Sequence, residues 1–381
     1  MLAAAGMLSA APPRSSLVGT APQREPNAAV RRPREDSMRM VSHIRATGIL
    51  AAVAMAMSTA PAPAADFYAG KTIDFIIGSN PGGGYDIYAR ALARHIVNHI
   101  PGKPQIIPKN LPGAGSGKAA AFMQTLAPKD GTALGAVFPG ALMEPLLGSR
   151  AKAQYDPPKF QYVGTADSGT RVCALWHGSQ TKSFADAQKR KTILGASQAG
   201  GSSRDYGHMH NHLNGAKFDI VSGYKGSVDI MLAVERGEVD GMCGYDWSSL
   251  RTQRAHWIAE KKVNLIVQVA LEPHAELTKM GVPTIWSFIK NEEDKKVAEL
   301  IVTQQVFGRP YFVPAGTPAD RVQILRDAFD KTMKDPAFLA DAKKQRLDIE
   351  PLGGVKIQKM IEDLYASPAK LVERAKAAVK P

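Results

Sequence analysis

Three consecutive glycines, Gly82–Gly84, lie where an apolar stretch gives way to a helical pattern. The stretch Ile73–Ile77 predicts a buried strand, and Tyr85–His99 places apolar residues at helical spacing. A glycine loop between a strand and a helix directs unpaired backbone N–H groups and the positive end of a helix dipole at one place. Such a place favours an anion, although a tight turn without a ligand would use the same glycines. The loop matches neither G-x-x-x-x-G-K-[ST] nor G-x-G-x-x-G, so nucleotide binding is not predicted.

A second glycine loop, Gln198–Ser203, repeats this chemistry, because its hydroxyls can cap the helix expected at Ser203–Leu213. On that helix His208 and His212 lie four residues apart and share a face, as two zinc ligands would. A zinc site needs three or four ligands and no HExxH glutamate is present, so solvated imidazoles are the preferred interpretation and no metal is expected. An exported metal-assisted hydrolase that uses His208 and His212 is the alternative function.

The N-terminal region has the pattern of an export signal. From about residue 38 a basic segment precedes the apolar run Thr47–Met57, and Ala62–Ala64 offers a small-x-small cleavage site. The apolar run is too short to cross a bilayer. We therefore expect residues 1–65 to be a disordered leader followed by a signal peptide at about 38–65, and the protein to be periplasmic.

From about Asp66 onward the chain resembles the substrate-binding proteins of tripartite tricarboxylate transporters, the Bug or TctC-like family. In that family a strand ends in a Pro-Ala-Gly-Gly-Gly-Thr-Asp loop, and here the loop is Asn80–Asp86. Five further segments match in the same order: Asn110–Gly115, Pro128–Thr132, Gly223–Ser227, Gly237–Gly241 and Pro314–Pro318. Two departures stand out, since Ser79-Asn80-Pro81 replaces Phe-Pro-Ala and Tyr85 replaces threonine. The usual C4 and C5 dicarboxylates therefore cannot be assumed, and an aromatic or other organic acid fits equally well.

The resemblance, together with the alternation of strand-like and helical stretches, implies an α/β fold. We expect a two-lobed periplasmic binding protein of type II-like architecture, with each lobe a mostly parallel sheet flanked by helices. Lobe 1 would comprise 66–168 and 305–381, and lobe 2 would comprise 169–304. The glycine loops should emerge at the carboxyl ends of their strands, where open α/β sheets bind ligands.

The function that the resemblance implies is capture of a carboxylate-bearing organic anion for a tripartite tricarboxylate-type transporter. The chain would be a binding protein and not an enzyme, without a cofactor. Lys225 would lie in a Tyr-Lys-Gly ligand loop, and Tyr245–Trp247 in a cleft loop. The expected ligand-binding residues are Ser79, Asn80, Gly82, Gly83, Gly84, Tyr85, Asp86, Pro139, Ser202, Ser203, Arg204, Tyr224, Lys225 and Asp246.

The two cysteines, Cys173 and Cys243, lie in the strands predicted at Arg171–His177 and Val239–Cys243. The fold of the family places these strands side by side, so a disulfide is sterically possible in an exported protein. Two buried thiols that act as small hydrophobic side chains are the alternative, and the sequence leaves the choice open.

The formal net charge of +13 suits an anionic ligand or an acidic surface. Lys and Arg are scattered along the chain, however, and do not form a stripe with interleaved aromatic residues, so nucleic acid is not expected as a partner. The expected partners are a small organic acid and the membrane subunits of the transporter, and the protein should be a monomer.

Overall fold

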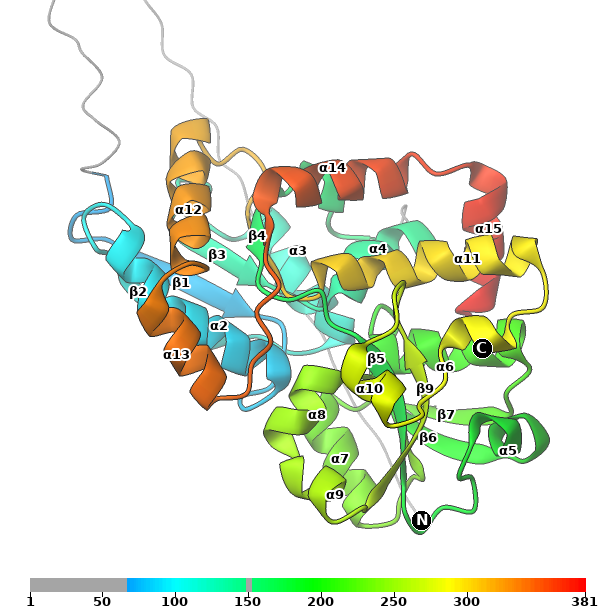
Figure 1. The fold of residues 1–381 in the computed structure, drawn as a ribbon. Helices are drawn as coiled ribbons and strands as arrows, with labels where there is room; N and C mark the ends of the chain where they lie inside the picture. The colour runs from blue at the N-terminus through cyan, green and yellow to red at the C-terminus, as the bar shows by residue number, and fades with distance from the viewer. Residues whose placement is uncertain (1–66, 149–152) are drawn as a thin grey trace, which may run out of the picture. The chain divides into compact units, whose positions relative to one another are not determined.

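The computed structural model describes residues 67–148 and 153–381, so the predicted leader and signal peptide lie outside the described residues. All described residues belong to one compact unit, Pro61–Pro381. Within it the strands form two separate sheets, each accompanied by helices (Figure 1).

The first sheet has six strands in the order β11-β4-β10-β3-β1-β2. Strand β1 pairs in parallel with β2 and β3, whereas β10 runs antiparallel to both β3 and β4, and β11 is antiparallel to β4. The strand bounds are β1 Thr72–Ile77, β2 Gln105–Asn110, β3 Ala133–Ala136, β4 Gln161–Thr165, β10 Pro310–Val313 and β11 Leu352–Gly353.

The second sheet has five strands in the order β7-β6-β8-β5-β9. Strand β6 is parallel to β7 and β8, and β5 is antiparallel to β8 and β9. The bounds are β5 Arg171–Trp176, β6 Thr192–Ala196, β7 Phe218–Ser222, β8 Gly241–Asp246 and β9 Val263–Val269. The chain thus passes between the sheets after β4 and returns before β10.

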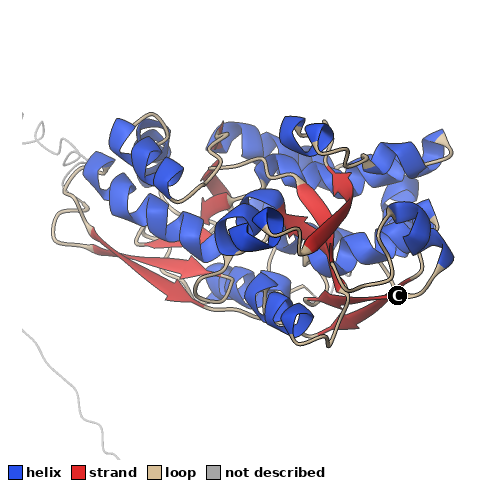
Figure 2. Cartoon of the chain, turned by 60° about the horizontal axis from the view of Figure 1, so that its bottom comes forward, coloured by secondary structure: helices blue, strands red, loops and turns tan. Residues whose placement is uncertain are grey.

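Helices lie on both sides of the strands (Figure 2). Their bounds are α2 Gly84–Ile96, α3 Gly117–Thr125, α4 Pro139–Leu147, α5 Phe184–Lys189, α6 Ser202–Asn214, α7 Ser227–Glu235, α8 Trp247–Gln253, α9 Ala255–Ala259, α10 Ala275–Lys279, α11 Glu292–Val302, α12 Ala319–Thr332, α13 Pro336–Lys344, α14 Gly354–Tyr365 and α15 Ala369–Ala378.

The core explains why strand β1 ends where it does. Ile73, Phe75 and Ile77 have no exposed surface and pack with Tyr88 and Leu92 of α2. Each fully buried side chain of this size contributes about 1.5–3 kcal/mol through removal of apolar surface from water. The glycines that follow cannot extend this packing, so the chain turns and begins α2.

The predicted fold class is confirmed, since two sheets flanked by helices are present, but both sheets are mixed. The antiparallel pairs arise at the strands next to the two crossings, β4, β5 and β10. One strand was misplaced: we expected Val239–Cys243, and β8 instead spans Gly241–Asp246, because Arg171 and Val172 of β5 pair with Asp246 and Tyr245. The lobe boundaries stay a prediction.

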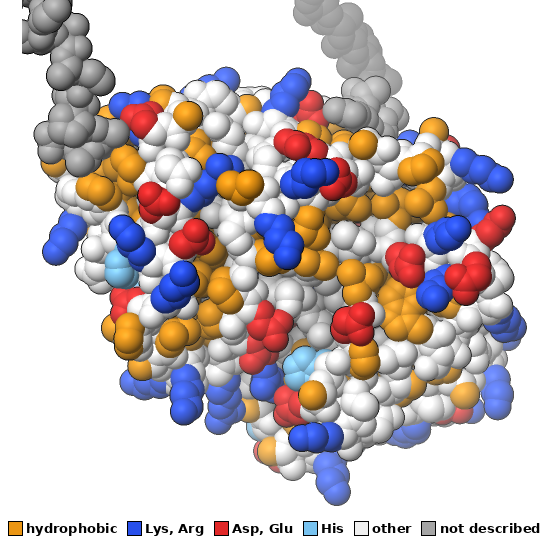
Figure 3. Space-filling view, turned by 45° about the horizontal axis from the view of Figure 1, so that its top comes forward, with side chains coloured by type: hydrophobic (Ala, Val, Ile, Leu, Met, Phe, Trp, Pro, Cys, Tyr) orange, Lys and Arg blue, Asp and Glu red, His pale blue; other side chains and the backbone are white. Residues whose placement is uncertain are grey.

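Charged side chains of both signs are mixed on the face drawn in Figure 3, where Lys and Arg lie among Asp and Glu. No basic stripe crosses that face.

Among the described helices, none combines the length and the apolar character needed to cross a membrane.

Candidate functional site

A cavity lies at the carboxyl end of β1 and is closed on the other side by segments that follow β6 and β8. Its volume is about 50 Å³, which is room for a few water molecules. It is lined by Ser79, Asn80, Gly83, Gly84, Tyr85, Phe138, Arg171, Ser197, Ser202, Ser203, Gly226, Ser227, Val228, Met242, Gly244, Tyr245, Asp246 and Ser249.

Three of the helices that begin at this cavity have a glycine as their N-cap. Gly83 precedes α2, Gly201 precedes α6 and Gly226 precedes α7. A glycine has no side chain with which to cap the first turn, and the first N–H groups of a helix have no acceptor within the helix. The three positive helix ends therefore present backbone donors to a common space, which favours an anionic ligand.

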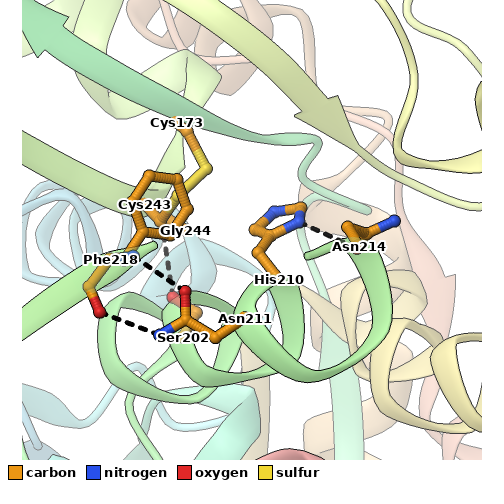
Figure 4. The surroundings of a disulfide bond; sticks show 8 residues. All are labelled: Cys173, Ser202, His210, Asn211, Asn214, Phe218, Cys243 and Gly244. Carbon is orange, nitrogen blue, oxygen red and sulfur yellow. Dashed lines mark hydrogen bonds between the residues drawn. A yellow bond between two sulfur atoms is a disulfide. The ribbon is translucent and has the colours of Figure 1, made fainter. Parts of the chain in front are cut away.

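Serine hydroxyls make the remaining lining polar, and several of them already hold the loops in place. Ser202 Oγ donates to the Gly244 carbonyl oxygen at 2.9 Å (Figure 4). Ser203 Oγ accepts from the Ser197 backbone N–H at 2.9 Å. These bonds fix the start of α6 against the ends of β6 and β8, so the donors at that helix start are held in position before a ligand arrives.

A buried ionic network lies directly behind the cavity. Asp246 pairs with both Arg171 and Arg309, and Arg309 Nε lies 3.8 Å from Asp167 Oδ2. All four side chains are almost completely buried. Burial raises the pKa of Asp167, and the two arginines oppose that shift. Because two arginines face two carboxylates, the charges within the network balance. The donors that remain for a ligand are the backbone N–H groups and serine hydroxyls that line the cavity.

Tyr85 forms an aromatic wall of the cavity together with Phe138. Their ring centroids lie 4.6 Å apart, and the Arg309 guanidinium lies 4.4 Å from the Tyr85 centroid. Arg171 Nη2 donates to Tyr85 Oη at 3.0 Å. The ring and the hydroxyl of Tyr85 are thus both held in place by neighbouring side chains.

The two sides of the cavity approach each other through glycines. A Cβ added at Gly84 would overlap Ser249 Oγ of α8, and one at Gly140 would overlap the Gly200 carbonyl oxygen. Asn80 Nδ2 also donates to Asp229 Oδ2 of α7 at 2.9 Å. Only glycine permits this close approach at Gly84 and Gly140.

Eight of the residues predicted from the sequence line the cavity: Ser79, Asn80, Gly83, Gly84, Tyr85, Ser202, Ser203 and Asp246. The other six, Gly82, Asp86, Pro139, Arg204, Tyr224 and Lys225, do not. Asp86 instead accepts the Gly82 N–H and pairs with Arg90, and Arg204 pairs with Asp205. Lys225 is exposed. A role in binding stays a prediction for all of these residues.

Sequence reasoning missed Arg171, Arg309 and Phe138. Arg171 heads the apolar stretch RVCALW, where a charged residue at the start of a buried strand could have been noticed. Arg309 offers no comparable local signal, because its partners come from distant segments. Phe138 is the N-cap of α4, one position before the predicted Pro139.

The histidines considered for a metal do not converge on the cavity. His212 Nε2 lies 3.0 Å from the Lys380 carbonyl oxygen, and burial lowers the pKa of His208 to about 4. In the described ranges, the group of side chains close enough to share a metal is Cys173, His210 and Cys243, which includes neither His208 nor His212. The hydrolase alternative is therefore unsupported.

Asp205, next to the start of α6, makes folding stability depend on pH. Burial raises the pKa of Asp205 to about 7, although its carboxylate accepts from Arg204 and from the Gly200 N–H. The native state therefore holds a proton that the unfolded chain has already lost above about pH 4. Its stability falls as pH rises from 4 to 7, by up to about 1.4 kcal/mol per pH unit.

We expect Asp205→Asn to remove this part of the pH dependence while it keeps an acceptor for Gly200. Urea unfolding at pH 5, 6, 7 and 8 measures the difference between variant and wild type. Parallel stability profiles across that range would show that Asp205 does not titrate as described.

Comparisons with known proteins support the resemblance seen in the motifs. No protein-family model matches the chain. A UPF0065 protein from the gbd 5′ region of Cupriavidus necator is 29% identical over 326 residues, which cover 81% of this chain and 88% of that protein.

Solved structures agree with this relationship. The periplasmic binding protein BugD superposes with a TM-score of 0.64 at 19% identity and covers 82% of this chain and 98% of its own. MatC from Rhodopseudomonas palustris with bound malate superposes with a TM-score of 0.62 at 19% identity, and the match covers 81% of this chain and 99% of MatC. The resemblance first seen in the glycine loops is therefore confirmed: this chain is related in sequence to a UPF0065 protein and has the fold of the Bug-type periplasmic binding proteins.

Proposed function

We propose that this protein is a periplasmic solute-binding protein that captures a small organic carboxylate. The observation that carries this proposal is the convergence of three glycine-capped helix starts, those of α2, α6 and α7, on one cavity. Backbone donors and helix dipoles stabilise a carboxylate without a buried unpaired cation, which would be costly when the ligand is absent.

The cavity favours a short acid. Tyr85 packs against Phe138 and closes one end of the cavity. MatC, which shares the fold, holds malate. A carboxylate at the helix starts and polar groups facing the serines would satisfy the donors on both sides of the cavity.

Delivery to a tripartite tricarboxylate-type transporter follows from the family resemblance and would occur without chemical change to the ligand. It requires export, which we assign to a signal peptide around residues 38–65, and the protein would act as a monomer. N-terminal sequencing of the periplasmic protein should place the mature start between Ala64 and Asp66. A start at Met1 with the apolar run retained would contradict the assignment.

Titration calorimetry tests the binding function. Malate, succinate, adipate and benzoate serve as probes, with the corresponding uncharged amides as controls. We expect at least one acid to bind with an affinity that its amide lacks, because the helix starts favour negative charge. Equal binding of acids and amides would contradict recognition by these helix starts.

Tyr85 should set the upper limit on ligand length. We expect Tyr85→Ala to shift preference from malate toward adipate by about tenfold, a free-energy change of about 1.4 kcal/mol, because the ring no longer closes the cavity. Tyr85→Phe is the matched control, since it keeps the ring against Phe138 and removes only the hydroxyl. Calorimetry on both variants measures the ratio, and an unchanged ratio in Tyr85→Ala would show that the wall lies elsewhere.

A further inference from the structure

A second constellation of chemically active side chains lies outside the cavity, between the second sheet and α6. Cys173 of β5 and Cys243 of β8 are disulfide-bonded, and His210 of α6 lies beside them (Figure 4). One ring nitrogen of His210 and the two sulfur atoms all lie within 4.8 Å of one another. All three residues have no exposed surface.

The protonation state of His210 follows from its contacts. Its Nδ1 lies 3.1 Å from Asn214 Oδ1, and an amide oxygen only accepts, so Nδ1 carries the proton. Nε2 therefore has a free lone pair, and it has no hydrogen-bond partner. Phe184, at a centroid distance of 5.1 Å, packs edge-on against the ring.

A buried acceptor without a donor is costly, and a disulfide cannot supply a donor. The cost would be removed if the lone pair bound a metal ion. Two thiolates and one imidazole form a soft donor set that suits thiophilic ions. The contact with Asn214 resembles the outer-shell hydrogen bond that fixes the tautomer of a metal-ligating histidine.

We propose that the reduced protein binds one thiophilic d¹⁰ metal ion, Zn²⁺ or Cu⁺, through Cys173 Sγ, Cys243 Sγ and His210 Nε2. A dithiol reductant supplies two electrons and two protons to the S–S bond and itself becomes a disulfide. A phosphine supplies the two electrons, while one water molecule supplies the two protons and the oxygen of the resulting phosphine oxide. Either reaction leaves Cys173 and Cys243 as thiols. The metal ion then displaces thiol protons to solvent as the S–metal bonds form. Oxidation to the disulfide removes both thiolate ligands, so the site exists only in the reduced state.

This inference is independent of the ligand cavity. Because the three side chains are buried, the ion has to enter while the reduced chain is open, during folding or a transient opening. Once bound, it would replace the disulfide as the link between β5 and β8 and would add α6 to that link.

The test uses the protein unfolded in denaturant with a phosphine reductant and refolded anaerobically with one equivalent of Zn²⁺ or Cu⁺. Metal analysis after desalting gives the stoichiometry, and Co²⁺ in place of Zn²⁺ reports thiolate ligation through its absorption bands. We expect about one ion per reduced protein and none per oxidised protein. Refolding with one equivalent of Zn²⁺ and one of Cu⁺ in the same sample, followed by metal analysis, identifies which ion the site prefers.

Two variants on α6 form a matched pair. His210→Phe keeps an aromatic ring against Phe184 but removes the ligand nitrogen, and His212→Phe changes an exposed histidine on the same helix. We expect His210→Phe to weaken metal binding at least about tenfold and His212→Phe to leave it unchanged. Circular dichroism after refolding shows whether each protein has regained its fold. If reduced wild type refolds only with metal, that recovery itself supports the site.

The proposal is overturned if the refolded reduced protein takes up no metal and its fold does not depend on metal. It is also overturned if His210→Phe binds the ion as tightly as wild type.

Discussion

Gly84→Ala is expected to weaken carboxylate binding by about ten- to a hundredfold while each sheet stays folded. The added methyl group would overlap Ser249 Oγ, which cannot easily move aside. That oxygen donates to Asp246 Oδ1 at 2.9 Å and accepts from Arg309 Nη2 at 3.0 Å. Overpacking of this kind costs about 1–3 kcal/mol, and the strain would lie in the wall of the cavity, which both Gly84 and Ser249 line.

The loss should be reversible by a second substitution. Ser249→Gly removes the atoms that the new methyl group meets, so Gly84→Ala combined with Ser249→Gly should recover part of the affinity. Calorimetry on both single variants and the double variant gives the coupling between the two positions. Additive effects, without recovery, would show that the methyl group acts by some route other than the contact with Ser249.

Gly83 provides the neighbouring comparison. Its φ of −70° is open to any residue, and an added Cβ would lie 3.1 Å from the Asn80 carbonyl oxygen, which is tight but tolerable. The structure assigns the positive φ to Gly82, at +75°, and the closest approach to Gly84.

Reduction of the disulfide is the second change with a large expected effect. Cys173 and Cys243 are bonded across 70 positions of sequence. In the chain-entropy account, opening a loop of this length costs about 2–5 kcal/mol of unfolding free energy. Urea unfolding with and without reductant, in metal-free buffer, measures the cost.

Thiol counting on the denatured, unreduced protein is the companion measurement. We expect no free thiols. Two thiols per chain would instead support the alternative that Cys173 and Cys243 are buried thiols that act as small hydrophobic side chains. The free energy of unfolding would then not change with reductant.

Local patterns in the sequence were sufficient to predict the elements that carry the glycine loops. Strand β6, Thr192–Ala196, is a short run that ends just before the glycine loop Gln198–Ser203, which is a local signal in the sequence. Helix α2 begins at Gly84, one residue before the helical pattern that starts at Tyr85, because the glycine itself enters the first turn.

The buried ionic network could not be predicted in this way. Arg171, Asp246 and Arg309 belong to three separate segments that meet only through the pairing of β5 with β8 and the return of the chain at β10. The same pairing extends β8 to Asp246 and makes Asp246 the N-cap of α8, where its carboxylate accepts from the Ser249 N–H at 2.9 Å. Tertiary contacts decide all of these features.

The most direct test of the binding function is mass spectrometry of the protein purified gently and without added organic acids. The native protein should carry a small acid at up to one molecule per chain, and denaturation should release it chemically unchanged. In Gly84→Ala, purified in parallel, occupancy should fall sharply. An equally occupied Gly84→Ala protein, or a released compound without an acidic group, would contradict the account of a carboxylate held at the three helix starts.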